Sequence, residues 1–338
     1  MATEQDDNGA ETVTKAEEHY MQSYSHHMVH EELIRDTVRT ETYRRSLEQN
    51  RHLVEGKIVL DIGCGTGVLS MFAARAGAAH VYAVDVADIA DHAAAVVREN
   101  GLDGVITVIK GRMEEVELPV EAVDVIVSEW MGYCLLYEAM LDTVIYARDR
   151  YLREGGVMLP DKAALYLCAA EDAEYMREKI DFWDNVYGFK MSSLKEAALA
   201  EPLVDYVQSS AVFTGAVPVL TLDVLTCTAE DLSFTSEFTL TAQRNDFCHA
   251  FIAFFEVAFT QTHKPLYIST SPSNPQTHWK QTIFYLREPL TVCSGEEISG
   301  TISMHPNGRN RRDMDVDFTV RFEGRHMQVN NEQAFRIR

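Results

Sequence analysis

The sequence has 338 residues, enough for two domains with a sizeable hydrophobic core. Its 30 Lys and Arg residues against 52 Asp and Glu residues give a formal net charge of −22 at pH 7. So negative a surface repels phosphate backbones and anionic lipids and attracts basic partners, which argues against nucleic acid or membranes as direct partners. The acidic excess covers the first three quarters of the chain, whereas residues 261–338 carry ten bases and eight acids.

The cysteine and histidine patterns indicate the cellular compartment and bear on metal binding. The six cysteines form no CxxC pair, and there is no signal peptide and no apolar run long enough to span a bilayer. We therefore expect free thiols in a reducing compartment, the cytoplasm and nucleus. The twelve histidines show no HExxH or CxxH spacing, so no metal site is expected.

The N-terminal segment divides into two parts. Residues 1–15 are polar and acidic, a composition typical of disorder. Residues 16–50 place apolar side chains four apart, as at Tyr43 and Leu47, which predicts helices. The run from Arg35 to Asn50 is expected to form one amphipathic helix.

Residues 51–159 alternate short apolar strands with segments of helical length. The expected strands are 57–61, 80–85, 105–110 and 123–128, and the expected helices between them are 68–76 and 89–100. Strands that alternate with helices at this spacing predict βαβ units and a parallel sheet. We therefore expect a Rossmann-like α/β domain.

Beyond residue 160 the pattern becomes that of antiparallel strands. From Met314 to Phe322 every second residue is apolar, which indicates a half-buried strand. Similar runs predict a β-barrel or sandwich over residues 160–338. Within it, residues 171–201 are helical in pattern and rich in aromatic residues. Either these rings fill the core, or they belong to an arm that buries them against a second subunit.

A glycine-rich turn, Ile62-Gly-Cys-Gly-Thr-Gly67, follows the first strand of the α/β domain. Such a turn lets a ligand approach the backbone at the start of the next helix, although an unliganded tight turn is the alternative. The dinucleotide fingerprint would need a glycine at position 68, where the chain has Val68. Asp85 ends the next strand, where it can hold both ribose hydroxyls. This arrangement favours S-adenosylmethionine over NAD.

Two glutamates nine residues apart follow the strand at 123–128. Glu129 and Glu138 cannot share a helix face, but a loop that turns at Gly132 could bring their carboxylates together. A partly desolvated carboxylate pair needs a cation, and a guanidinium group is planar, always charged and bound bidentately. Two carboxylates would also draw positive charge away from the reacting nitrogen and aim it at a sulfonium methyl group. The alternative is two unrelated surface acids.

Three segments resemble signature motifs of the protein arginine N-methyltransferases. Residues 128–138 (SEWMGYCLLYE) are similar to their double-E loop, residues 277–279 (THW) to their THW loop and residues 60–67 to their cofactor motif. The resemblance covers about residues 20–338 and is closest to the type I enzymes, in particular their predominant member. It implies a Rossmann-like S-adenosylmethionine-dependent methyltransferase domain, followed by a β-barrel domain with an inserted helical dimerisation arm at 171–201.

The resemblance also implies an activity and roles for individual side chains. Type I enzymes make ω-N-monomethylarginine and asymmetric dimethylarginine on Arg/Gly-rich proteins, including RNA-binding proteins and histones, and release S-adenosylhomocysteine. The implied catalytic residues are Glu129, Glu138 and His278. The implied cofactor residues are His30, Arg39, Asp61, Gly63, Gly65, Asp85, Met113 and Glu114. The implied substrate residues are Leu33, Asp36, Met131, Tyr133 and Trp279. The helices of residues 16–50 would close over the cofactor, with Arg39 on its methionyl carboxylate.

Three positions depart from the family pattern: Asp85 replaces a glutamate, Met21 replaces the phenylalanine of a YFxxY segment that begins at Tyr20, and Leu33 replaces a methionine of the arginine pocket. Two alternatives therefore stay open. One is a scaffold or regulatory subunit that joins a paralogous methyltransferase through the arm, rather than a homodimer. The other is a small-molecule methyltransferase. Methylation of nucleic-acid bases is not supported, because the chain has neither a [DN]PP[YF] tetrapeptide nor a Pro-Cys nucleophile, the motifs of such enzymes.

Overall fold

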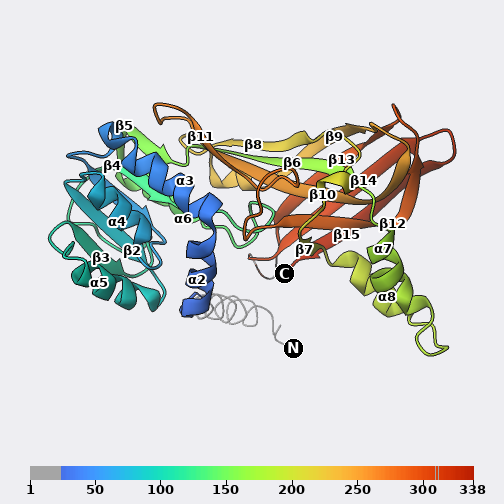
Figure 1. Ribbon diagram of the computed structural model, residues 1–338, viewed down its shortest axis with the longest axis horizontal. Coiled ribbons are helices and arrows are strands. Elements are labelled where there is room, and N and C mark those ends of the chain that lie inside the picture. Colours follow the sequence, from blue (N-terminus) through green and yellow to red (C-terminus); the bar gives the residue numbers. More distant parts are fainter. Residues whose placement is uncertain (1–23, 309, 311) are drawn as a thin grey trace, which may run out of the picture.

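The computed structural model describes residues 24–308, 310 and 312–338 (Figure 1). An α/β domain and an antiparallel β domain lie end to end, and a helical arm projects from the β domain at the end far from the α/β domain. The predicted fold class is therefore confirmed. The acidic segment 1–15, Tyr20 and Met21 lie outside the described residues.

In the described part of the chain, two α-helices, α2 (His27–Arg35) and α3 (Thr37–Glu48), precede the first strand. Helix α3 lies inside the predicted helix from Arg35 to Asn50 and is two residues shorter at each end, so that prediction is confirmed apart from its exact bounds. The chain breaks at Asp36, whose side chain accepts a hydrogen bond from the backbone N–H of Arg39 and so caps α3. The exact start of α3 depends on this side-chain cap, which apolar spacing does not report.

The α/β domain has a five-stranded parallel sheet in the order β3-β2-β1-β4-β5. Its strands are β1 (Ile58–Ile62), β2 (His80–Asp85), β3 (Ile106–Lys110), β4 (Val123–Ser128) and β5 (Leu152–Leu159). Its helices are α4 (Val68–Arg75), α5 (Ile89–Glu99) and α6 (Leu141–Tyr151). The strand order reverses between β1 and β4, and ligands of open α/β sheets bind at the carboxyl ends of strands at such a switch point.

The β domain consists of two antiparallel sheets, in the orders β7-β12-β10-β6-β8 and β15-β14-β13-β9, with β11 paired to β10. Its strands are β6 (Lys162–Ala170), β7 (Leu203–Asp205), β8 (Val217–Asp223), β9 (Phe234–Thr241), β10 (Asp246–Phe259), β11 (Leu266–Ser269), β12 (Gln281–Val292), β13 (Glu297–Pro306), β14 (Met314–Glu323) and β15 (Gln328–Ile337). Buried rings of Phe251, Phe284 and Phe318 pack together in its core. The alternating burial along β14 agrees with the sequence prediction.

The arm contains α7 (Ala173–Tyr175) and α8 (Ser192–Ala200). The other helical elements of the described residues are short: η1 (Arg51–Leu53), the π-helical η2 (Met176–Ile180), η3 (Asp181–Asp184), η4 (Ser209–Ala211) and η5 (Ala229–Leu232). At the tip of the arm, Tyr187 is 97% exposed and Phe189 is 69% exposed. The interpretation that all the aromatic rings of this segment fill the core is therefore wrong. The exposed rings form an apolar surface of the kind that a second subunit covers.

Asp61 is a fully buried acid on β1. The Ser70 hydroxyl, in the first turn of α4, donates to its Oδ2 atom at 2.6 Å, whereas its Oδ1 atom has no hydrogen-bond partner among the described residues. Burial raises the pKa of Asp61 to about 7, although the hydrogen bonds from Ser70 oppose the shift. The folded chain therefore retains a proton here that the unfolded chain loses near pH 4.

We predict that Asp61→Asn changes how stability depends on pH. Because the pKa of Asp61 is higher in the folded than in the unfolded chain, Asp61 contributes most to the stability of the folded state at low pH. This contribution is lost as the pH rises through 7. As the pH rises from 5 to 8, the free energy of unfolding of Asp61→Asn should therefore increase by roughly 2–3 kcal/mol relative to that of the unmodified chain. Denaturant unfolding at both pH values measures this difference.

The control is Asp149→Asn, because the Asp149 side chain is 63% exposed. It should leave the pH dependence of unfolding unchanged. If Asp61→Asn and the unmodified chain lose stability in parallel between pH 5 and pH 8, the assignment of a raised pKa to Asp61 is wrong.

Candidate active site

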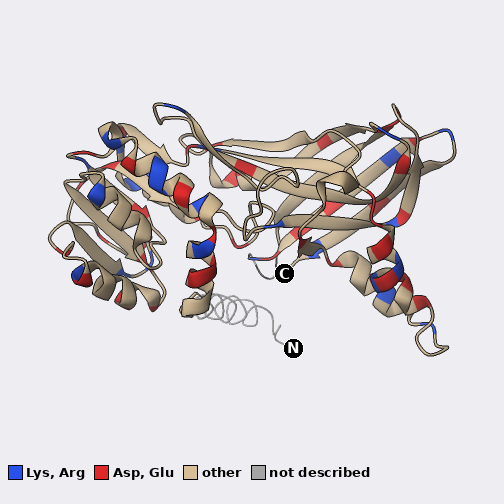
Figure 2. Cartoon of the chain, in the orientation of Figure 1, with Lys and Arg blue, Asp and Glu red and all other residues tan. Residues whose placement is uncertain are grey.

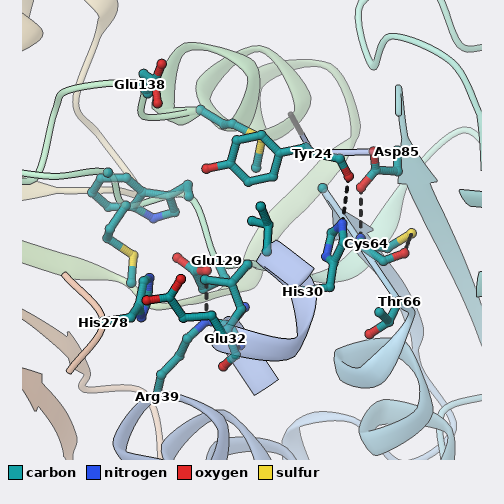
Figure 3. Close-up of a pocket in the computed structure, with 18 of the residues that line it drawn as sticks. Tyr24, His30, Glu32, Arg39, Cys64, Thr66, Asp85, Glu129, Glu138 and His278 are labelled. Atoms are coloured by element: carbon teal, nitrogen blue, oxygen red, sulfur yellow. Dashed lines mark hydrogen bonds and ion pairs between the residues drawn. The ribbon is translucent and has the colours of Figure 1, made fainter. Parts of the chain in front are cut away.

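One large pocket lies at the carboxyl ends of β1, β2 and β4 and is bounded by α2, α3 and the segment before β12 (Figure 3). Its empty volume is about 1220 Å³, part of it open to solvent. The predicted site residues in its lining are His30, Leu33, Arg39, Gly63, Gly65, Asp85, Glu129, Met131, Tyr133, Glu138, His278 and Trp279. The structure thus brings most of the predicted cofactor and substrate residues into one cavity.

The glycine-rich turn forms one wall of this pocket. Gly63 and Gly65 have left-handed backbone angles, with φ of 68° and 53°, which side chains larger than glycine rarely adopt. A Cβ atom at Gly63 would lie 2.3 Å from Cε of Met140, and one at Gly65 would lie 3.2 Å from Nδ1 of His30. His30 is held in turn by a contact of 2.7 Å from its Nε2 atom to the carbonyl oxygen of Tyr24. Glycine therefore suits both positions, because the side chains of Met140 and His30 pack closely against the turn.

Asp85, at the end of β2, lies against the glycine-rich turn. Its Oδ2 atom accepts a hydrogen bond from the backbone N–H of Gly65 at 2.8 Å, and its Oδ1 atom accepts one from Ala87 at 2.9 Å. Burial raises the pKa of Asp85, and these backbone hydrogen bonds oppose that rise. A carboxylate oxygen can accept a second hydrogen bond. Asp85 therefore keeps the capacity to bind a hydroxyl group.

Three predicted cofactor residues are not among the lining residues. Asp61 is fully buried and supports α4 through Ser70. Met113 is 3% exposed, and the carboxylate of Glu114 accepts a hydrogen bond from the Thr143 hydroxyl at 2.7 Å. Their roles toward a cofactor stay predictions.

The loop of residues 129–138 folds back on itself as a tight hairpin. The backbone N–H of Gly132 donates to the carbonyl of Leu135, and that of Tyr137 donates to the carbonyl of Tyr133, both at 3.0 Å. A Cβ atom at Gly132 would lie only 1.7 Å from the carbonyl oxygen of Tyr137. The turn at Gly132 expected from the sequence is therefore present and requires glycine.

Glu129 forms a buried ion pair at the start of this hairpin. The Arg39 Nε atom donates to Glu129 Oε2 at 2.8 Å, and the two side chains are only 8% and 9% exposed. The second carboxylate oxygen, Oε1, is buried without a hydrogen-bond partner among the described residues. A buried acceptor without a partner is costly, so this oxygen is ready to accept an N–H group from a ligand.

Glu138 lies on another side of the same pocket (Figure 3). Its backbone is left-handed, with φ of 56°. Burial raises the pKa of Tyr137, and the neighbouring Glu138 contributes through its charge and a side-chain hydrogen bond. The hairpin thus delivers both glutamates to the pocket, although their carboxylates do not lie side by side.

His278 joins the β domain to the N-terminal helices. Its Nδ1 atom lies 2.8 Å from Oδ2 of Asp36, and its backbone N–H donates to the same oxygen at 2.9 Å. Burial would raise the pKa of Asp36, but the hydrogen bonds from His278 and Arg39 outweigh it and lower the pKa. Next to it, the Trp279 indole N–H donates to the carbonyl of Met131 at 3.1 Å. These bonds close one side of the pocket.

The lining residues that the sequence prediction missed include Glu32, Tyr137 and Met140. Tyr137 is adjacent to Glu138, so the loop motif itself could have indicated it. Glu32 follows His30 on α2, but only the packing of that helix against the pocket reveals its position (Figure 3). Across the described ranges, no group of three or more His, Cys, Asp or Glu side chains could hold a metal ion. None of the described helices is long and apolar enough to cross a membrane.

Comparison with known proteins gives matches over both domains. Residues 59–156 match the methyltransferase domain family, and residues 161–325 match the arginine methyltransferase oligomerization subdomain. Protein arginine N-methyltransferase 1.1 of Arabidopsis thaliana is 51% identical over 96% of this chain and 83% of its own length. Protein arginine N-methyltransferase 1 of Chlamydomonas reinhardtii is 52% identical over 95% of this chain and 93% of its own length.

The solved structures that resemble this chain belong to the same family as these relatives. The Trypanosoma brucei PRMT1 enzyme-prozyme heterotetrameric complex with AdoHcy contains a chain that is 44% identical, with a TM-score of 0.92 over 94% of this chain and 100% of that one. Protein arginine methyltransferase 10 of Arabidopsis thaliana is 29% identical, with a TM-score of 0.86 over 94% of this chain and 100% of that one. Identity near 50% over almost the whole length, together with the shared fold, shows that this chain belongs to the protein arginine N-methyltransferase family.

Proposed function

We propose that this chain methylates arginine side chains of Arg/Gly-rich proteins and forms ω-N-monomethylarginine and asymmetric dimethylarginine, as the type I enzymes of its family do. The observation that carries the proposal is the buried carboxylate of Glu129. One of its oxygens has no hydrogen-bond partner among the residues that the structure describes, and it lies in the same pocket as the glycine-rich turn. RNA-binding proteins and histones with Arg/Gly-rich segments are the substrates we expect.

The residues of the pocket fit S-adenosylmethionine. Gly63 and Gly65 expose the backbone of the turn to the pocket, Asp85 offers hydroxyl acceptors beside it, and Arg39 supplies a cation for a carboxylate. The Trypanosoma brucei relative was solved with AdoHcy, the product that remains after methyl transfer. When bound, the cofactor supplies an electrophilic methyl group on a sulfonium.

Glu129 and Glu138 would bind the guanidinium group from two sides of the pocket. Within the described part of the chain, the Oε1 atom of Glu129 has no hydrogen-bond partner to lose when an N–H group approaches. Two carboxylates that accept hydrogen bonds draw the positive charge toward the nitrogens they contact and leave more electron density on the third. Fixing the group in this way also orients the reacting nitrogen, which supplies part of the rate enhancement.

His278 is the residue that we propose as proton acceptor. Because Asp36 is ionised, we place a hydrogen on His278 Nδ1, donated to Asp36 Oδ2 across 2.8 Å. In the neutral ring this leaves the lone pair on Nε2. That atom would take the proton that the substrate nitrogen loses as its bond to carbon forms. Trp279 and Met131 pack beside it and restrict access of water.

The acidic surface would gather cationic substrates. Asp and Glu residues are spread over the α/β domain, the β domain and the arm (Figure 2). A net charge of −22 attracts Arg-rich chains over distances of about a Debye length, and salt weakens this attraction. We also propose that the protein acts in the cytoplasm and nucleus. These reducing compartments suit its six free cysteines, five of which are buried.

The arm would join two subunits. The chain matches an oligomerization subdomain, and the tip of the arm exposes large apolar side chains. A homodimer is one arrangement, and a hetero-oligomer with a paralogous subunit is the other. The second is supported by the Trypanosoma brucei relative, which assembles as an enzyme-prozyme heterotetramer.

We predict that Glu138→Gln lowers methyl transfer by at least about 100-fold, because it removes one of the two charges that polarise the guanidinium. Cofactor affinity should change little. Incubation with labelled S-adenosylmethionine and a Gly/Arg-rich peptide measures transfer, and calorimetry with S-adenosylhomocysteine measures cofactor binding.

Glu121→Gln is the matched control, since Glu121 is exposed in the loop before β4. It should retain full activity. A fully active Glu138→Gln chain would contradict the proposed mechanism. If the unmodified chain alone binds no S-adenosylhomocysteine, the alternative of a scaffold subunit is favoured instead.

We predict that Tyr187→Ser combined with Phe189→Ser lowers the molar mass of the assembly in solution, because both rings are exposed in the single chain and would be buried between subunits. Light scattering after size-exclusion chromatography measures the mass. The control Tyr267→Ser removes a ring that is 60% exposed on β11, away from the arm, and should leave the mass unchanged. An unchanged assembly in the double variant would refute the role of the arm tip.

A further inference from the structure

The ion pair between Arg39 and Glu129 connects the two halves of the proposed site. Arg39 is the residue proposed to meet the cofactor carboxylate, whereas Glu129 is proposed to bind the substrate guanidinium. The two are joined at 2.8 Å and are almost fully buried. The protein thus presents its own guanidinium group to the carboxylate that must bind a guanidinium from the substrate.

Further bonds hold Arg39 in this position. Its Nη1 atom donates to the carbonyl oxygen of Leu33 at 3.2 Å and to the hydroxyl of Thr40 at 3.4 Å. Its backbone N–H donates to Asp36, so α3 anchors it independently of Glu129. The side-chain hydrogen bonds of Arg39 to described residues come from Nε and Nη1 and not from Nη2. Arg39 also belongs to the lining of the pocket. The Arg39 guanidinium can therefore donate a hydrogen bond to a second anion.

The charge on Arg39 decides how strongly Glu129 attracts a substrate. Paired with Arg39, the Glu129 carboxylate is neutralised, and at low exposure such a pair exerts much less attraction on a third, cationic group than an uncompensated carboxylate does. A second carboxylate beside Arg39 would share its positive charge. Arg39 would then neutralise Glu129 less, and the Glu129 carboxylate would attract the substrate guanidinium more strongly.

We propose that Arg39 couples the two binding events. The carboxylate of the cofactor's methionyl part engages Arg39, weakens its hold on Glu129, and so makes the substrate guanidinium bind more tightly after the cofactor than before it. This inference rests on the proposed function. Because such coupling is reciprocal, a bound substrate peptide strengthens cofactor binding by the same factor.

A different role for Arg39 gives a different result. If Arg39 only holds Glu129 in place, its bond to Glu129 stays the same whether or not a cofactor carboxylate is present. The chemical group that separates the two roles is therefore the carboxylate of the cofactor and not its adenosine part.

The test uses two nucleosides that differ in this group. S-adenosylhomocysteine carries the amino acid part, whereas 5′-methylthioadenosine has the same adenosine and thioether but lacks it. Fluorescence anisotropy of a labelled Gly/Arg-rich peptide, titrated with the full chain, gives the peptide affinity with no nucleoside and with each at saturation. We expect S-adenosylhomocysteine to tighten peptide binding by at least about 5-fold, the lower end of typical coupling, and 5′-methylthioadenosine to change it less than about 2-fold.

A variant of Arg39 tests the route of the coupling. In Arg39→Met the effect of S-adenosylhomocysteine on peptide affinity should fall below about 2-fold. The control Arg35→Met removes an arginine of α2 whose side chain is 77% exposed and pairs with Glu31, and it should keep the full effect. If Arg39→Met does not fold, the comparison of the two nucleosides in the unmodified chain still decides the question.

Two outcomes overturn the inference. One is equal tightening by both nucleosides, and the other is coupling that persists in a folded Arg39→Met chain. Failure of the proposed function is recognised separately, because a chain that binds no S-adenosylhomocysteine by calorimetry and transfers no methyl group fails before any coupling is measured. A chain that binds the nucleoside and methylates the peptide, yet shows no coupling, refutes this inference alone.

Discussion

The site depends on the requirement that a buried carboxylate be compensated. Glu129 is removed from water at the end of β4, where only a cation in close contact makes its charge tolerable. Arg39 provides that cation, and Asp36 fixes Arg39 by capping the helix that carries it. The same Asp36 binds His278 from the β domain. One electrostatic constraint therefore ties the N-terminal helices, the α/β domain and the β domain around a single pocket.

Features set by local chemistry could be read from the sequence. β4 coincides with its predicted bounds because a short run rich in valine and isoleucine favours a strand, and β14 follows from strict alternation. The glycine-rich turn and the hairpin at Gly132 were predictable because only glycine fits their backbone or the space around it. Their positions brought most of the predicted site residues to the pocket.

Features set by distant partners could not be read in the same way. The break at Asp36 involves His278, 242 residues away, and no periodicity reports it. The direction of Glu138 follows from a left-handed backbone at a residue that is not glycine. Whether the aromatic rings of the arm lie inside or outside depends on where the β domain ends, and only the folded chain shows Tyr187 in solvent. The burial of Asp61 behind the turn likewise separates it from the cavity that its position in the motif suggests.

The central claim is that this pocket directs a methyl group to a guanidinium nitrogen. The most direct measurement is mass spectrometry of a Gly/Arg-rich peptide after incubation with the purified chain and S-adenosylmethionine, with fragmentation that separates asymmetric from symmetric dimethylarginine. The account predicts monomethylarginine followed by asymmetric dimethylarginine. Symmetric dimethylarginine, or methyl groups on any residue other than arginine, would contradict it.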